Sequence, residues 1–325
     1  MSIFYHLLVQ QFNFFQDNGE FTMKLLTPSL VIFLISTNLF AYGADTSHQV
    51  PEKFFKSTII SENVFLLKGE GGNIALLRGN EGLVLIDAGY AKMSKALEYE
   101  LAKHGGVEDV VYLINTHWHA DHTEGNAFIG DHAPIIAHKN VRSRLLTRQE
   151  VKFFNMVSEP YASHAIPSIT FDKAIGLSIN GETLEVIHFA NGHTDGDSVV
   201  FLKSANIVHM GDHFFSGFYP FIDVDTGGNV RNMANNIKSI LARIDDETIV
   251  IPGHGPLSSK ADLEEFHQML VETTAEVEAM LTKGMTAEEI QTEGLSLEWE
   301  DWSAGYLSTD AWIKIVIRCL NTPMP

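Results

Sequence analysis

Short apolar runs, continuous or alternating with polar residues, recur along the chain from residue 57 and predict β-strands. Gly-rich or charged turns separate the first four runs, which indicates an antiparallel meander. The predicted strands span 57–61, 63–68, 73–78, 82–87, 110–114, 134–137, 183–189, 198–202, 207–210 and 248–251.

Between and after these runs, apolar residues recur at helical spacing. Met93, Leu97 and Leu101 lie four residues apart, and two glycines end this helix at 105–106. Strands and helices alternate in two successive groups without a linker. The pattern predicts an α/β fold with two packed sheets and helices outside, a four-layer αββα sandwich in one domain over 50–325. The predicted helices span 91–104, 141–154, 230–244, 259–283, 287–292 and 309–320.

The N-terminal segment has the pattern of an export signal. Lys24 precedes an apolar run at 30–35, and small residues suited to cleavage follow at 41, 43 and 44. We therefore expect a signal peptide within 1–44, translation from Met23, and a periplasmic or secreted protein. The run is short for a stable membrane span, although an uncleaved anchor stays open.

Charge and cysteine content exclude several kinds of site. Acidic residues outnumber basic ones by 41 to 22, and the net charge of −19 would repel a nucleic-acid backbone. Nucleic acid is therefore not expected as a substrate. The single cysteine, Cys319, can form neither an intramolecular disulfide nor a thiolate metal cluster. Its apolar neighbours predict a buried thiol.

The segment that follows the strand predicted at 110–114 is rich in metal-ligand residues. It contains His117, His119, Asp121 and His122, four ligand-type side chains within six residues. Two histidines two positions apart on an extended segment face the same side and can hold one ion. The aspartate and histidine of the next turn can face a second ion. The segment therefore predicts a metal site.

This His-x-His-x-Asp-His segment resembles the metal signature of the metallo-β-lactamase superfamily. Four further blocks resemble the family's pattern in the correct order, at 85–89, 192–194, 211–212 and 252–255. The first block contains Asp87, which we expect to orient a ligand without binding metal itself. The resemblance implies two zinc ions, with the first held by His117, His119 and His193, the second by Asp121, His122 and His254, and both by Asp212.

The resemblance also implies a hydrolase of the metallo-β-lactamase type, in which two ions make a bound water nucleophilic at neutral pH. Asp121 would be the catalytic residue that orients this water or accepts its proton. The expected substrate is a small molecule with an ester, lactone, amide or β-lactam bond. Apolar residues at 153–156 and 214–221 favour an uncharged or partly hydrophobic substrate.

Three alternatives remain open at this stage. A thioesterase of the glyoxalase II type has the same ligand set, but often has Cys-Gly-His-Glu where this chain has Pro-Gly-His-Gly at 252–255. An iron-dependent oxidoreductase on the same scaffold and a non-catalytic zinc-binding protein are the others. Known β-lactamases of the family replace Asp212 with another residue, so β-lactam hydrolysis stays undecided.

Overall fold

The computed structural model describes residues 53–322. The expected signal peptide, start at Met23 and cleavage region therefore lie outside the described residues. Within 53–322, no helix has the length and apolar content needed to cross a membrane.

The first sheet has seven strands in the order β1-β2-β3-β4-β5-β6-β9. Strands β1 to β4 form the predicted antiparallel meander, whereas β4, β5, β6 and β9 pair in parallel. The bounds are β1 Lys56–Ile59, β2 Val64–Lys68, β3 Ile74–Gly79, β4 Gly82–Ile86, β5 Val110–Ile114, β6 Ile135–His138 and β9 Ile169–Phe171.

The second sheet has five strands in the order β10-β11-β12-β13-β14. All neighbours are antiparallel except β13 and β14, which pair in parallel. The bounds are β10 Ala174–Ile179, β11 Glu182–His188, β12 Ser198–Leu202, β13 Ile207–His209 and β14 Ile249–Ile251.

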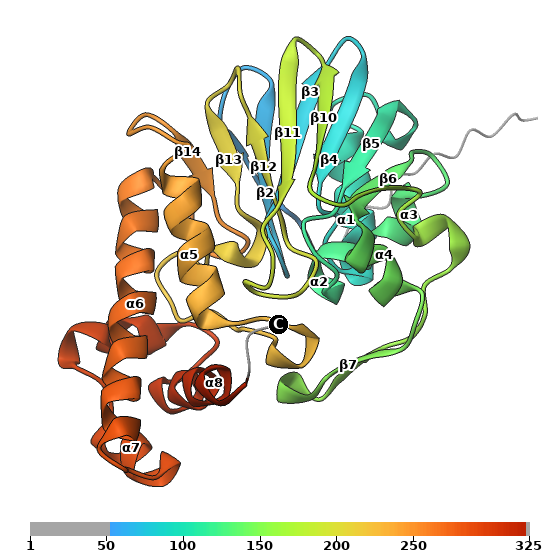
Figure 1. Ribbon diagram of the computed structural model, residues 1–325. Coiled ribbons are helices and arrows are strands. Elements are labelled where there is room, and N and C mark those ends of the chain that lie inside the picture. Colours follow the sequence, from blue (N-terminus) through green and yellow to red (C-terminus); the bar gives the residue numbers. More distant parts are fainter. Residues whose placement is uncertain (1–52, 323–325) are drawn as a thin grey trace, which may run out of the picture. The chain divides into compact units, whose positions relative to one another are not determined.

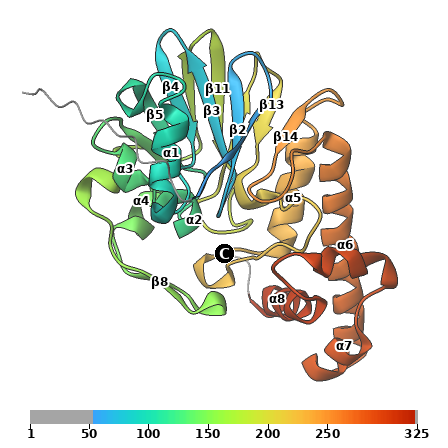
Figure 2. The same cartoon turned by 180° about the vertical axis from the view of Figure 1, so that it is seen from behind.

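Helices cover the outer faces of both sheets (Figures 1 and 2). The α-helices are α1 Ser94–Leu101, α2 Ala120–Thr123, α3 Asn126–Ile129, α4 Lys139–Leu145, α5 Val230–Leu241, α6 Lys260–Thr282, α7 Ala287–Glu293 and α8 Thr309–Asn321. Short 3-10 helices are η1 Ala91–Met93, η2 Val107–Asp109, η3 Lys152–Phe154, η4 Ser163–Ala165, η5 Gly211–His213, η6 Val224–Thr226 and η7 Leu297–Ala304.

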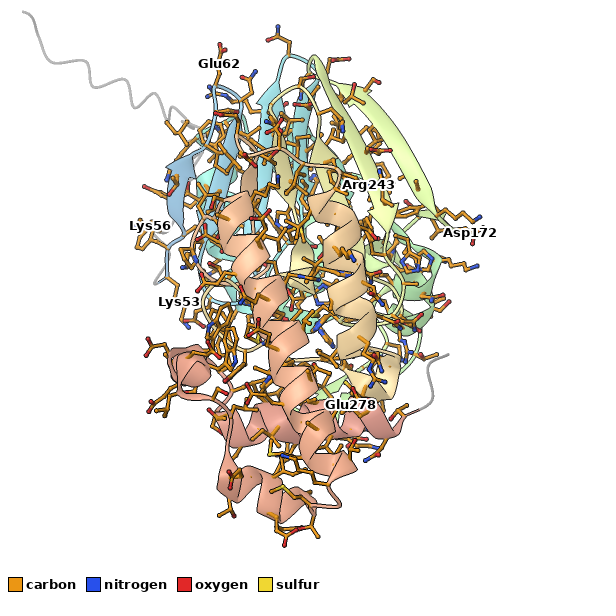
Figure 3. All side chains as sticks on the ribbon, turned by 60° about the vertical axis from the view of Figure 1, so that its left-hand side comes forward. Lys53, Lys56, Glu62, Asp172, Arg243 and Glu278 are labelled. Carbon is orange, nitrogen blue, oxygen red and sulfur yellow. The ribbon has the colours of Figure 1, made fainter. Side chains whose placement is uncertain are left out.

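Three apolar clusters hold the layers together. The cluster between the sheets joins side chains such as Leu66 and Ile86 of the first sheet to Val186 and Val200 of the second. A second cluster packs α1 against the outer face of the first sheet. A third packs α5, α6 and α8 against the second sheet, and Figure 3 shows α5 and α6 side by side across it. The predicted four-layer αββα sandwich with C-terminal helices is confirmed.

The helix predicted over 141–154 is wrong beyond Leu145. Helix α4 ends at Leu145, and β7 (Gln149–Val151) pairs antiparallel with β8 (Met156–Ser158). Asn155 takes a left-handed conformation with φ of 51°, which asparagine tolerates and which turns the chain between the strands. We call residues 149–158 the aromatic hairpin, because Phe153 and Phe154 lie at its turn.

Strands β9 and β10 and the 3-10 helix η7 were not predicted. In β10, exposed residues alternate with partly buried ones, and this edge strand pairs with β11 alone. Its sequence, Ala-Ile-Gly-Leu-Ser-Ile, contains a glycine and small residues that weaken the strand pattern. Pairing with β11 therefore defines this strand more than its own sequence does.

Candidate metal centre

The candidate site lies where parallel strands of both sheets end. Asp87 comes directly after β4, and His117 comes shortly after β5. These two strands are parallel neighbours. In the second sheet Asp212 follows β13, and His254 follows its parallel neighbour β14. The carboxyl ends of parallel neighbours lie at the same edge of a sheet. The topology thus brings together segments that are far apart in the sequence.

The seven predicted ligand residues form two neighbouring groups. In each group, one potential ligand atom per residue lies within 4.8 Å of all the others. The side chains are buried except for Asp121, which is half-buried. The first group is His117, His119, His193 and Asp212, and the second is Asp121, His122 and His254.

In the first group three imidazole nitrogens face one another. His119 Nδ1 lies 3.1 Å from His117 Nε2 and 2.8 Å from His193 Nε2. Ligands about 2.0–2.1 Å from one tetrahedral ion lie about 3.3 Å apart, so this spacing is close to that of a shared zinc ion. The Oδ2 atom of Asp212 lies 3.4 Å from His193 Nε2 and 3.7 Å from His117 Nε2.

The opposite nitrogen of each ring has an oxygen partner. His193 Nδ1 donates to the carbonyl oxygen of Phe221 at 2.7 Å, and His119 Nε2 donates to Asp223 Oδ2 at 3.2 Å. His117 Nδ1 lies 3.1 Å from the hydroxyl oxygen of Thr116. With a hydrogen on each outer nitrogen, the inner nitrogens present lone pairs to one another. Such an arrangement is suited to a cation between them.

The second group lies beside the first, with Asp212 between them. Asp121 Oδ2 lies 3.2 Å from His254 Nε2, which lies 3.3 Å from His122 Nε2. Asp212 Oδ1 lies 3.1 Å from His122 Nε2, and its Oδ2 lies 3.3 Å from His254 Nε2. Asp212 Oδ1 is buried without a hydrogen-bond partner of suitable geometry among residues 53–322. This carboxylate can therefore reach both groups and has a lone pair free for an ion.

The pKa values of the histidines differ between the groups. Burial lowers the pKa of His193 to about 4, and burial together with the charge of His122 holds the pKa of His117 well below its usual value. Burial also opposes charge on His122 and His254, but the carboxylates around them, chiefly those of Asp212 and Asp121, together outweigh it. The pKa of His122 is raised well above its usual value, and that of His254 is raised to about 9.

Asp87 orients the second group without reaching its centre, as expected from the sequence. This fully buried residue has a φ of 64°. Its Oδ1 accepts the Thr116 backbone N–H at 2.8 Å, and its Oδ2 accepts the Thr116 hydroxyl at 2.8 Å and His122 Nδ1 at 2.7 Å. These bonds fix the His122 ring with Nε2 toward His254.

Sequence reasoning missed two further carboxylates that position histidines. Buried Asp197 accepts the backbone N–H groups of His193 and Thr194 and so holds the loop that carries His193. Burial raises the pKa of Asp197 to about 8 despite these donors. Asp223 accepts from His119, as described above. Asp197 lies only four residues after His193, so the sequence itself could have suggested this contact. Asp223 lies 104 residues from His119, so no local pattern links the two.

Four further histidines, His138, His188, His209 and His213, lie outside both groups. His213 is buried, and its Nε2 lies 3.1 Å from the Asn236 side-chain nitrogen. His209 Nε2 lies 3.1 Å from the backbone oxygen of Asn73. His138 and His188 stack on each other with ring centroids 3.6 Å apart. These contacts give all four rings a structural role.

A cavity of about 560 Å³ opens onto both groups. This volume lies within the usual range of small-molecule sites, about 300–1,000 Å³. Asp121, Asp212 and His254 form part of its polar end. Apolar side chains form much of the remaining wall, among them Val151, Phe154, Met156, Val157, Phe215 and Phe221.

Comparison with known sequences identifies related proteins. The family model described as the metallo-beta-lactamase superfamily matches residues 67–254, more than half of the 325 residues. Probable metallo-hydrolase YqjP of Bacillus subtilis is 28% identical over 273 residues, which cover 74% of this chain and 81% of that protein. Metallo-beta-lactamase type 2 of Bacillus cereus is 25% identical over 189 residues, which cover 58% of this chain and 68% of that protein.

Comparison with solved structures identifies proteins of the same fold. A metallo-beta-lactamase from Pontibacter korlensis aligns with a TM-score of 0.53 at 21% identity, covering 66% of this chain and 98% of that one. The sec-alkylsulfatase Pisa1 from Pseudomonas sp. aligns with a TM-score of 0.62 at 16% identity. That alignment covers 81% of this chain but 49% of the sulfatase. At these identities the likeness shows the fold alone.

Proposed function

Because this chain belongs to the metallo-β-lactamase superfamily, we propose that it is an exported hydrolase that uses two zinc ions to open an ester, lactone or amide bond. The observation that carries the proposal is the pair of ligand groups with Asp212 between them. In this assignment His117, His119 and His193 hold one ion, Asp121, His122 and His254 hold the other, and Asp212 contacts both. Export rests on the apolar run and small residues within 24–44.

The donor set suits zinc, since imidazole and carboxylate are ligands of this ion. Two bound divalent ions would bring the pKa of a water between them toward about 7 and polarise the bond under attack. Asp121 has the position to orient that water and accept its proton. In the metal-free protein burial disfavours its charge, but the charges of His122 and His254 together outweigh burial and lower the pKa of Asp121 to about 2. Bound zinc would require neutral His122 and His254 and would itself keep this carboxylate, which lines the cavity, ionised.

The cavity wall argues against a glutathione thioester as the substrate. Among residues 53–322, no lysine or arginine lines the cavity, whereas Glu70 and Glu124 do. Glutathione carries two carboxylates, which this wall would leave without a cationic partner. The same reasoning makes a neutral ester, lactone or amide the better candidate.

Metal analysis and a substrate panel test the proposal. We expect close to two zinc ions per chain, hydrolysis of at least one chromogenic ester, lactone or amide, and loss of activity with a chelator. A phosphodiester and a sec-alkyl sulfate belong in the panel, the latter because one structural neighbour is a sec-alkylsulfatase. One ion per chain, hydrolysis that survives chelation, or iron with redox turnover would overturn the proposal.

A further inference from the structure

The cavity has an apolar side that the metal groups do not use. We infer that this side binds an extended, uncharged alkyl or acyl group of the substrate, so that the enzyme acts on neutral acyl compounds and discriminates against those with an anionic chain end. The inference rests on the proposed hydrolase function. We define the apolar arm as Val151, Phe154, Met156, Val157 and Phe221, which line the cavity together.

The apolar arm begins at the first ligand group and extends to the aromatic hairpin. The Phe221 ring lies 6.0 Å from His119 and 5.9 Å from His193, measured between ring centroids. The centroid of the Phe221 ring also lies 4.8 Å from that of Phe154 and 5.4 Å from that of Phe153. A chain attached to a carbonyl at the metal groups would therefore meet Phe221 first and the hairpin next.

The hairpin presents apolar surface that the fold itself does not cover. Phe154, Met156 and Val157 are 41%, 37% and 49% exposed although all three line the cavity. Figures 1 and 2 show the hairpin extending away from the sheets toward α8. A contiguous exposed apolar patch beside a cavity is typical of a binding surface. An alkyl group lying on it would remove apolar surface of both partners from water.

The charges around the cavity explain the preference for a neutral chain. Glu70, which lines the cavity, pairs with Lys53 and Lys92. Glu124 lines the cavity and accepts the backbone N–H of Ala91. A carboxylate at the end of the bound chain would therefore lose hydration without gaining a cationic partner in the described cavity wall. Any positive charge of bound metal lies at the opposite end, where the reaction occurs.

A series of p-nitrophenyl esters tests the inference with the metal-loaded protein. From acetate through butyrate to hexanoate we expect kcat/KM to rise about fourfold per methylene, the factor that corresponds to 0.8 kcal/mol per buried CH₂. The hemiglutarate ester, with a carboxylate at a similar chain length, should be hydrolysed at least tenfold less efficiently than the hexanoate. Equal rates along the series, or a preference for hemiglutarate, would overturn the inference.

A matched pair of variants locates the effect. Val157→Lys places a cation on the apolar arm, so it should weaken the preference for hexanoate and improve hemiglutarate hydrolysis. Val271→Lys is the control, because Val271 on α6 is similarly exposed at 45% but does not line the cavity. Phe154→Ala provides a second variant and should flatten the chain-length dependence. Equal effects in Val157→Lys and Val271→Lys, or none in Phe154→Ala, would contradict the assignment of the apolar arm.

A binding measurement separates this inference from the proposed hydrolysis. Calorimetric titration with methyl ketones from 2-pentanone to 2-nonanone should show a dissociation constant that falls with chain length. Such binding without hydrolysis of any ester, lactone or amide would overturn the proposed function and retain the binding site. If the esters are hydrolysed but neither kcat/KM nor the ketone dissociation constant depends on chain length, the proposed function stands and the binding site is overturned. A hairpin that instead contacts a membrane or another protein would give this second result.

Discussion

Replacing Asp87 with asparagine tests how strongly the centre depends on a residue outside the ligand set. Asparagine has nearly the shape of aspartate and tolerates the left-handed backbone at this position, where φ is 64°. The substitution therefore removes charge and one acceptor with little change in packing. Asp87 is fully buried, so water cannot replace what is lost.

The hydrogen bonds determine the size of the expected effect. Both oxygens of Asp87 accept from fixed donors, namely the Thr116 N–H on one side and the Thr116 hydroxyl and His122 Nδ1 on the other. With the amide NH₂ toward His122, this ring must move its hydrogen to Nε2, the nitrogen that faces His254. With the amide reversed, NH₂ meets the backbone N–H of Thr116. Either orientation loses a charge-assisted bond worth about 1.5–3 kcal/mol.

We therefore expect Asp87→Asn to weaken metal binding in the second group about 10–100-fold, the usual effect of removing a partner of a metal-bound histidine. Competition with a chromophoric chelator measures this affinity, and elemental analysis after dialysis measures occupancy. Asp172→Asn is the matched control, because Asp172 is exposed at the periphery (Figure 3). Its ion-pair partner is Lys139, which belongs to neither ligand group. An affinity of Asp87→Asn equal to that of the control would refute the reasoning.

Three further predictions follow from the same centre and from the N-terminus. Asp212→Ala should lower the occupancy of the second ion and the rate of hydrolysis. Asp121→Asn should reduce kcat by about 10² or more, with less effect on KM. If both variants were as active as Asp172→Asn in excess metal, the catalytic centre would lie elsewhere. In metal-free protein the free energy of unfolding should fall from pH 6.5 to 9, because folding raises the pKa of His254 from 6.5 to about 9 and the folded state loses its favoured proton across this window, a contribution of about 2–3 kcal/mol. Asp197, whose pKa burial raises to about 8, acts in the same direction. Urea unfolding at the two pH values checks this, and a constant or rising free energy would contradict it. Mass spectrometry of the exported protein should find an N-terminus between Tyr42 and Asp45, and intact residues 1–22 would overturn the predicted start and cleavage.

The residues of the two groups could be predicted because they match a family pattern in which each follows an apolar strand in a short local motif. The His117 segment follows β5, and the blocks of Asp212 and His254 follow β13 and β14. Apolar strands are visible in the sequence, and polar residues at their ends mark the edge of a sheet. Asp223 gave no such signal, since it acts on His119 through a loop that only the folded chain brings near.

The aromatic hairpin shows why the failed helix prediction coincides with the proposed substrate surface. Apolar spacing predicts secondary structure on the premise that apolar side chains face the protein's own core. Val141 and Leu145 fit that premise and lie buried in α4, whereas Phe154 and Met156 remain substantially exposed along the cavity. Because these side chains do not face the protein's own core, their apolar character has no fixed relation to a helical period. In the proposed complex the substrate, and not the core, completes their burial, which is why the local rule does not apply here.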